Sequence, residues 1–240
     1  MYSNRHLKEV VCTFKFIQGS VKWDSAFFGQ YFDKIIGYGF TERQEKKGIV
    51  FQFNPAMGNQ ASTVQEGESQ MIFRNPEKNY AITMGNQFIS FHIVSTYKNW
   101  EVFNEKLMKP FMEKYIELGI YEKLFSCQLV YLNSFGFSPN DNLSEYFMVI
   151  SNPLTQFGRE ANVQVAKNYI THNGIILNLR ITPQPAGTDG LIPYMLECGA
   201  TGTMQEGADI KDWQKISSDV RQPVRDFFES IITHKLRGIL

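Results

Sequence analysis

The chain has 240 residues, of which 43% are hydrophobic, so it is long enough to bury a substantial core. Lysine and arginine together number 24, as do aspartate and glutamate, and this balance argues against a nucleic-acid partner and against binding to an anionic membrane. Arg5, Lys8 and Glu9 place charges in the N-terminal segment, which predicts neither a signal peptide nor a membrane span, and we expect a cytoplasmic protein.

Ten segments predict β-strands, because they alternate apolar and polar residues or are rich in β-branched and aromatic residues. They are residues 9–16, 48–53, 70–74, 80–84, 87–94, 124–135, 145–151, 162–170, 174–181 and 194–204. Short connections typical of hairpin turns fall at residues 45–48, 75–79, 84–87 and 171–174. Strands joined by such short connections run antiparallel.

Three segments carry apolar residues at helical spacing, which predicts amphipathic helices. These apolar stripes cover residues 23–35, 100–118 and 213–236. Pro110 and Pro223 are expected to kink or divide the second and third helices, because proline cannot donate the helical hydrogen bond.

A tryptophan stands at the start of each predicted helix, at Trp23, Trp100 and Trp213. This recurrence suggests that repeated strand–helix–strands units could build the chain. No stretch rich in Pro, Gly and Ser divides it, so we predict one domain over residues 1–240. The predicted fold class is α+β, with a long curved, mostly antiparallel sheet packed against two or three amphipathic helices in a helix-grip or TBP-like arrangement.

The three cysteines, Cys12, Cys127 and Cys198, lie far apart and lack the paired spacing of a metal site or a redox motif. They are predicted to be buried reduced thiols. The glycine-containing segments 37–42 and 198–204 lack the sequence context of a nucleotide-binding turn. We therefore expect no metal and no cofactor.

His92 is the histidine with the most chemical promise. In residues 87–94, alternation places it on the mixed face of a strand whose other face is apolar. It could serve as an acid, a base or a ligand in a cavity lined by Tyr97 and Trp100, or it could pack and donate one hydrogen bond. No second histidine or cysteine stands nearby, which favours packing.

Tyr97 and Trp100 could stack on a planar ligand, because each offers a large face and a polar tip. Trp23 and Trp213 occupy comparable helix starts, which favours a packing role for all three tryptophans. Arg159 could hold a partner at a passage from loop to strand. Arg221 and Arg225 share the third helix with acidic residues, and these mixed charges predict a solvated face.

Several short motifs resemble a sporadically distributed family of bacterial and archaeal proteins of about this length, whose function has not generally been assigned. The family has an opening Glu-Val strand, a Tyr-x-x-Trp-x-x-Phe helix start, a Tyr-x-Asn strand and a terminal Ile-Thr-x-x-Leu helix. The matching residues are Glu9 and Val10, then Tyr97, Trp100 and Phe103, then Tyr131 and Asn133, and finally Ile232, Thr233 and Leu236. Ser134 and Phe135 depart from the apolar residue that often continues the Tyr-x-Asn strand in the family.

The resemblance implies genes that travel, such as those of defence islands or toxin–antitoxin loci, and it supplies no catalytic residue. Since no catalytic motif is present, we predict a non-enzymatic binding or accessory protein that binds another protein or a small ligand through a groove of the sheet. An edge strand could also support a homo-oligomer. The candidate binding residues are His92, Tyr97, Trp100, Asn133, Arg159 and Arg180. The alternative is an enzyme with His92 as its base and Asn133 or Arg180 orienting a substrate.

Overall fold

One antiparallel sheet of nine strands runs through the computed structural model, which describes residues 6–53, 62–150, 163–185 and 190–240, with backbone alone at 48–53 and 62–67. The order across the sheet is β2-β3-β4-β5-β1-β6-β9-β8-β7. The strands are β1 (Leu7–Ile17), β2 (Glu42–Phe53), β3 (Ser62–Asn75), β4 (Tyr80–Gly85), β5 (Phe88–Val94), β6 (Lys123–Phe137), β7 (Val165–Ile170), β8 (Ile176–Pro183) and β9 (Ile192–Asp209). Together with the helices, this sheet confirms the predicted α+β class.

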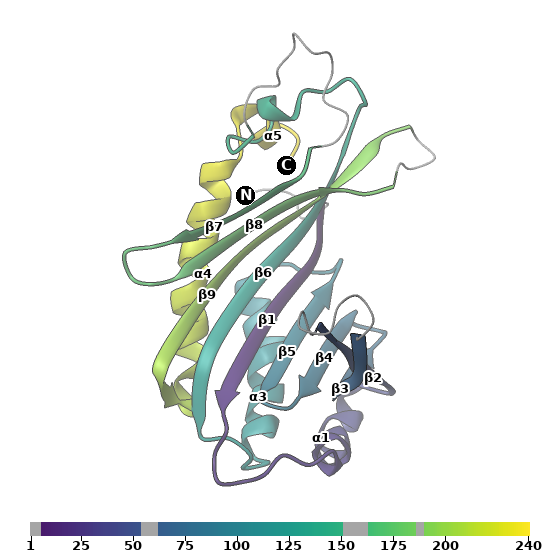
Figure 1. Ribbon diagram of the computed structural model, residues 1–240, viewed down its shortest axis with the longest axis vertical. Helices are drawn as coiled ribbons and strands as arrows, with labels where there is room; N and C mark the ends of the chain where they lie inside the picture. Colours follow the sequence, from purple (N-terminus) through teal and green to yellow (C-terminus); the bar gives the residue numbers. More distant parts are fainter. Residues whose placement is uncertain (1–5, 54–61, 151–162, 186–189) are drawn as a thin grey trace.

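The helices pack against one face of the sheet, and Figure 1 shows α3 and α4 behind the strands. The helical segments are α1 (Ala26–Ile35), α2 (Trp100–Phe103), a π-helical turn (Asn104–Met108), α3 (Lys109–Ile116), α4 (Trp213–Ile231) and α5 (His234–Arg237). Short 3₁₀ turns lie at Ile36–Tyr38, Leu143–Glu145 and Ile210–Asp212. Because α2, the π-turn and α3 follow one another without a break, four separate helices accompany the sheet.

Alternation along the strands sorts the side chains between the two faces. Val10, Cys12 and Phe14 of β1 are fully buried beneath the helices. On β5, Ile89 and Phe91 are buried in the same layer. The intervening residues of both strands point to the opposite, helix-free face, as the pattern of residues 87–94 predicts.

The strands fall into two similar groups about the central β1–β6 pair, with four strands beyond β1 and three beyond β6. β1 pairs with β5, the last strand before α2, and β6 pairs with β9, the last strand before α4. Each half therefore has one central strand, a set of outer strands and a helix that follows them, an order that fits a TBP-like arrangement. That the halves are repeats of one unit stays a prediction.

The prolines act differently in the two long helical segments. Pro110 stands in the first turn of α3, directly after the π-helical turn, so the second predicted helix is distorted there. Pro223 lies inside α4, which nevertheless continues from Trp213 to Ile231. Pro223 therefore does not divide the third helix, while a kink there stays a prediction.

Three local predictions are also wrong. No strand forms at residues 145–150, the described part of the strand expected at 145–151. A 3₁₀ turn ends at Glu145, and an isolated bridge joins Phe147 to Ile232. Tyr146 and Phe147 are both buried, whereas neighbouring residues of a strand would alternate. No hairpin turn forms at residues 45–48, because β2 passes through with a register shift. The third helix stops at Ile231, since Ile232 is extended and a new helix follows, capped by the Thr233 hydroxyl.

Candidate functional site

A cavity of about 460 Å³ opens between the sheet, α4 and the segment that links β5 to α2. The residues that line it come from four places: Leu7, Tyr131, Asn133 and Cys198 from the sheet, Tyr97, Lys98, Asn99 and Trp100 from the linking segment, Arg221, Val224, Arg225 and Phe228 from α4, and Leu240. We call this space the α4 pocket. Its volume lies in the range of small-molecule sites, which is roughly 300–1,000 Å³.

The linking segment is shaped by a sharp turn after β5 and by a helix cap. Ser95 has a positive φ of 59° and donates its backbone N–H to the carbonyl of Lys8, 2.7 Å away. The Asn99 side chain then accepts a hydrogen bond from the backbone N–H of Val102 at 2.8 Å, which starts α2 at Trp100. As a result Tyr97 and Trp100 both stand over the sheet.

The aromatic residues of this segment form a packing seam and also one wall of the α4 pocket. Trp100 is 6% exposed, and its ring meets Phe103 edge to face with centroids 5.9 Å apart. Tyr97 contacts Phe103 and, at a centroid distance of 5.9 Å, Tyr131. The two readings of the aromatic cluster, seam and ligand wall, are therefore compatible.

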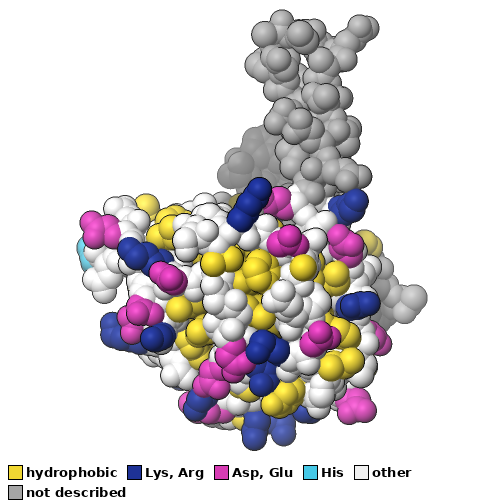
Figure 2. Space-filling model, turned by 90° about the horizontal axis from the view of Figure 1, so that it is seen from below, with side chains coloured by type: hydrophobic (Ala, Val, Ile, Leu, Met, Phe, Trp, Pro, Cys, Tyr) yellow, Lys and Arg dark blue, Asp and Glu magenta, His cyan; other side chains and the backbone are white. Residues whose placement is uncertain are grey.

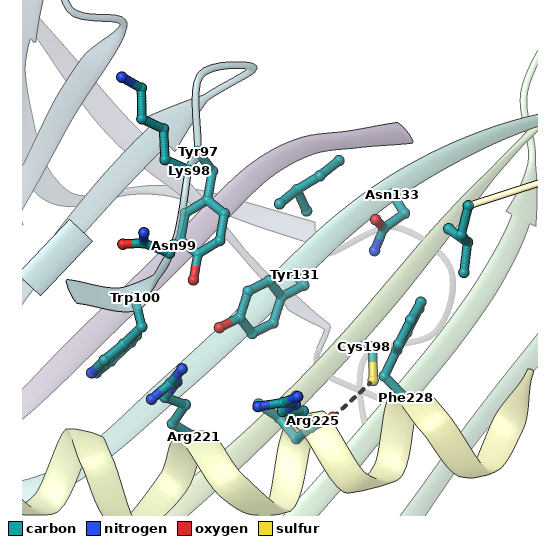
Figure 3. A pocket seen from close by; sticks show the side chains of 13 residues that line it. Tyr97, Lys98, Asn99, Trp100, Tyr131, Asn133, Cys198, Arg221, Arg225 and Phe228 are labelled. Carbon is teal, nitrogen blue, oxygen red and sulfur yellow. Dashed lines mark hydrogen bonds between the residues drawn. The ribbon is translucent and has the colours of Figure 1, made fainter. Parts of the chain in front are cut away.

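The hydroxyl groups of Tyr97 and Tyr131 lie near each other at the edge of the pocket (Figure 3). Burial raises the pKa of Tyr97, and it raises the pKa of Tyr131 well above the usual value, while the nearby Arg221 opposes both shifts. Both phenols are therefore neutral at physiological pH, and each keeps a proton that can be donated.

Two arginines enter the pocket from α4, one helical turn apart. The guanidinium group of Arg221 lies 5.5 Å from the centroid of the Trp100 ring, a cation–π contact. Figure 3 shows Arg221 and Arg225 rising from the side of α4 that faces Tyr131. Within the described residues, neither arginine forms an ion pair with a carboxylate.

Asn133 and Cys198 form the deeper part of the pocket. Asn133 is 8% exposed, and its side-chain amide, directed into the pocket in Figure 3, makes no hydrogen bond to the described residues. The Cys198 thiol is fully buried and donates weakly to the carbonyl of Val224 at 3.9 Å. Burial raises the pKa of Cys198 to about 12, so the thiol is protonated and is not a nucleophile at neutral pH.

Of the predicted site residues, the structure brings Tyr97, Trp100 and Asn133 together in the α4 pocket. His92 lies on the helix-free face, so the expectation that it shares a cavity with Tyr97 and Trp100 is wrong. Arg180 is exposed on β8, between Glu197 of β9 and Ala166 of β7. Arg159 lies outside the described residues.

His92 has its own polar neighbours on the helix-free face. Its Nδ1 is 2.7 Å from Oε1 of Glu9, and its Nε2 is 3.3 Å from the hydroxyl of Thr83. The three residues come from β5, β1 and β4, which are adjacent strands. The histidine thus packs within a hydrogen-bonded cross-strand row, as its isolation in the sequence favours.

No sequence pattern predicts that Arg221 and Arg225 belong to a site. The mixed charges of α4 predicted a solvated face, and Lys215 with Asp219, an exposed ion pair, fits that prediction. The signal that separates the two arginines is their position: they flank Val224 at the border of the apolar stripe. That border faces the pocket rather than solvent.

The remaining searches gave negative results within the described part of the chain. There, no three His, Cys, Asp or Glu side chains are grouped so that they could hold a metal ion. The helices found there are too short or too polar to cross a bilayer. Comparisons with protein-family models, with curated proteins and with solved structures found no match to this chain.

Proposed function

We propose that the protein is a non-enzymatic binding protein that holds a small ligand in the α4 pocket. The observation that carries this proposal is the unpaired amide of Asn133, which is 8% exposed and faces a cavity of about 460 Å³. A ligand in the cavity would hydrogen-bond to this amide in place of water.

The construction of the pocket supports the same proposal. Its interior is largely apolar, with Trp100, Cys198 and Val224 all buried, whereas Lys98, Asn99 and Arg225 at its rim are exposed. Ligand sites commonly combine an apolar interior with a few polar groups that orient the ligand. A rim of this kind gives solvent access to the interior.

Native mass spectrometry of the purified protein, compared with denaturing mass spectrometry of the same sample, tests the proposal. We expect an additional mass on the order of a few hundred daltons in the native spectrum alone. Asn133→Phe, which fills the pocket, should abolish it. Leu132→Phe, on the opposite face of the same strand, should keep it.

Two outcomes would contradict the proposal. The first is a native mass equal to the bare chain in the wild type and in both variants. The second is a stable complex with another protein and no small adduct, which would favour an accessory subunit of the kind that the family resemblance implies.

The second candidate is an enzyme that uses His92 as its base, because Glu9 and Thr83 lie within hydrogen-bonding reach of the two ring nitrogens. With the proton on Nδ1 facing Glu9, Nε2 would accept the proton of the Thr83 hydroxyl. We expect His92→Gln to lower the hydrolysis of an activated ester such as p-nitrophenyl acetate if this candidate holds. Equal rates in the wild type, in His92→Gln and in the exposed control His172→Gln would reject it.

A further inference from the structure

The α4 pocket is electrically unlike the rest of the molecule. Three of its lining residues are cationic, Lys98, Arg221 and Arg225, and none is an aspartate or a glutamate. The whole chain carries equal numbers of basic and acidic residues. Figure 2 shows both signs interspersed over the face seen there, whereas the charged side chains that line the pocket are all positive.

We propose that the ligand of the α4 pocket is an organic anion, with a carboxylate, sulfonate or phosphate group attached to a planar apolar body. This inference rests on the proposed function and specifies the ligand's chemical class. The anionic group is held by Arg221 and Arg225, because guanidinium groups offer paired N–H donors that match such oxygens.

The arginine pair is prepared for this role. Arg221 is half-buried, and its guanidinium group lies over the Trp100 ring, 5.5 Å from the centroid, a contact that does not neutralise its charge. Arg225 follows one turn later on the same side of α4, so the two groups can converge on one anion. Neither is neutralised by a carboxylate within the described residues, and the half-buried Arg221 gains more from an anion than the exposed Arg225 does.

The residues at the other end of the pocket determine which apolar body the ligand can have. Asn133 lies two residues from Tyr131 on the same face of β6, about 7 Å further along the strand. Between the arginines and this amide lie the rings of Tyr131 and Phe228 and the Cys198 thiol. The cavity of about 460 Å³ leaves room for a flat aromatic body along these rings, and the far end of that body can carry one polar group for the Asn133 amide.

Two fluorescent probes with the same skeleton separate charge from shape. 8-Anilinonaphthalene-1-sulfonate is an anion, and N-phenyl-1-naphthylamine is its neutral counterpart without the sulfonate. For the folded wild-type protein, we expect one site for each probe and about tenfold tighter binding of the sulfonate. Displacement of the sulfonate probe by 1-naphthoate or by 1-naphthyl phosphate then separates a carboxylate site from a phosphate site, and displacement by either supports the proposal.

The variants assign the effect to the arginines. The double variant Arg221→Gln, Arg225→Gln should lose the tenfold preference and bind the neutral probe as before. Arg221→Lys with Arg225→Lys keeps the charges and should keep part of the preference. Lys215→Gln, at an exposed ion pair on the same helix, should leave both affinities unchanged.

The outcomes show separately whether the pocket prefers anions and whether it binds a small ligand at all. Equal affinities of the two probes for the wild type, or an unchanged preference in the double glutamine variant, would overturn the anion proposal while leaving a ligand pocket in place. Binding of both probes that persists in Asn133→Phe, or no saturable binding of either probe, would overturn the proposed function as well. Circular dichroism of each variant verifies that it is folded.

Discussion

Tyr31 and Tyr115 provide a matched pair of buried hydroxyl groups in the core. Their rings are 0% and 1% exposed and meet edge to face at 5.9 Å. The Tyr31 hydroxyl donates to the carbonyl of Phe111 at 3.0 Å, whereas the Tyr115 hydroxyl has no partner among the described residues. One hydroxyl is thus satisfied and the other is buried at a cost.

Replacing each tyrosine by phenylalanine should therefore have different effects on the free energy of unfolding. Tyr31→Phe should lower it by about 1 kcal/mol, because a buried hydrogen bond is lost. Tyr115→Phe should leave it unchanged or raise it, because a desolvated hydroxyl is removed. Urea unfolding curves of the two variants measure both effects, and an equal loss in both would contradict the assignment.

The three cysteines should be unreactive in the folded protein. Cys12, Cys127 and Cys198 are free thiols with fully buried side chains, as the sequence predicts. Burial raises the pKa of Cys12 well above its usual value and that of Cys198 to about 12, so little thiolate forms. Ellman's reagent should label none of them before denaturation and all three afterwards; prompt labelling of a native thiol would contradict the structure.

The sequence predicted part of the candidate site, and the missing part has a physical reason. Tyr97 and Trp100 were recognisable because large aromatic residues with polar tips clustered within one short segment. Arg221 and Arg225 were not recognisable, because charged residues on a helix usually indicate a solvated face. Their role depends on what lies opposite the border of the apolar stripe of α4. That depends on how α4 lies on the sheet, which local sequence does not determine.

Among the elements, α4 carries the most informative local conflict. Pro223 has no N–H to donate to the carbonyl of Asp219, four residues earlier, and its ring crowds that carbonyl. The helix persists because Val220, Val224 and Phe227 bury its apolar stripe against the sheet. Packing therefore outweighs the intrinsic preference of one residue.

Pro223→Ala should raise the free energy of unfolding by about 1–3 kcal/mol, because the missing hydrogen bond is restored. Pro110→Ala is the comparison: Pro110 also lies inside a continuous helical segment, but the π-helical turn directly before it already interrupts the regular α-helical hydrogen bonds, so we expect a smaller change, of less than about 1 kcal/mol. Chemical unfolding of the two variants checks the signs. A loss of stability in Pro223→Ala would mean that the proline side chain itself contributes more to packing than the restored hydrogen bond does.

Strand predictions succeeded where alternation coincided with a buried face and failed where burial had another cause. Residues 87–94 alternate because β5 has helices on one side only. Residues 145–151 have the composition of a strand, but Phe147 packs its ring against Phe135 and Phe137 of β6 and bridges to Ile232 after α4. Such long-range burial is not visible in a short window of sequence.

At the scale of the whole molecule, the buried tyrosines predict how stability depends on pH. Burial raises the pKa of Tyr31, Tyr115 and Tyr131 well above the usual value of 10.0. Below pH 10 these groups are protonated in both the folded and the unfolded states. Above pH 10 the unfolded chain releases protons that the folded protein retains, so stability falls as pH rises.

The expected slope is about 1.4 kcal/mol per pH unit for each such tyrosine once the pH exceeds about 10. Buried thiols add to it with the same sign. Urea unfolding at a series of pH values between 8 and 11 measures this slope, and Tyr31→Phe should reduce it. A stability that stays constant through this range would show that the tyrosines are not buried.

The fold class followed from the sequence because amphipathic patterns of both periods were strong. The strand order could not be predicted from the sequence, because β1 pairs with β5 and β6, and neither strand is its neighbour in the chain. These pairings place Leu7, Tyr131 and Cys198 beneath α4, and they create the pocket. The candidate site is therefore a product of topology more than of any motif.

The NMR signals of the three tryptophan indole groups test most directly whether a small organic anion binds in the α4 pocket, because the three side chains are spread over the molecule. Trp100 lines the pocket, whereas Trp23 packs near Tyr121 and Trp213 against Phe14. In a ¹H–¹⁵N spectrum, with the Trp100 indole peak assigned by Trp100→Phe, we would titrate 8-anilinonaphthalene-1-sulfonate. The account predicts a saturable shift of the Trp100 indole N–H at one probe per chain, with the other two indole peaks unmoved; an unmoved Trp100 peak, or equal shifts of all three, would contradict it.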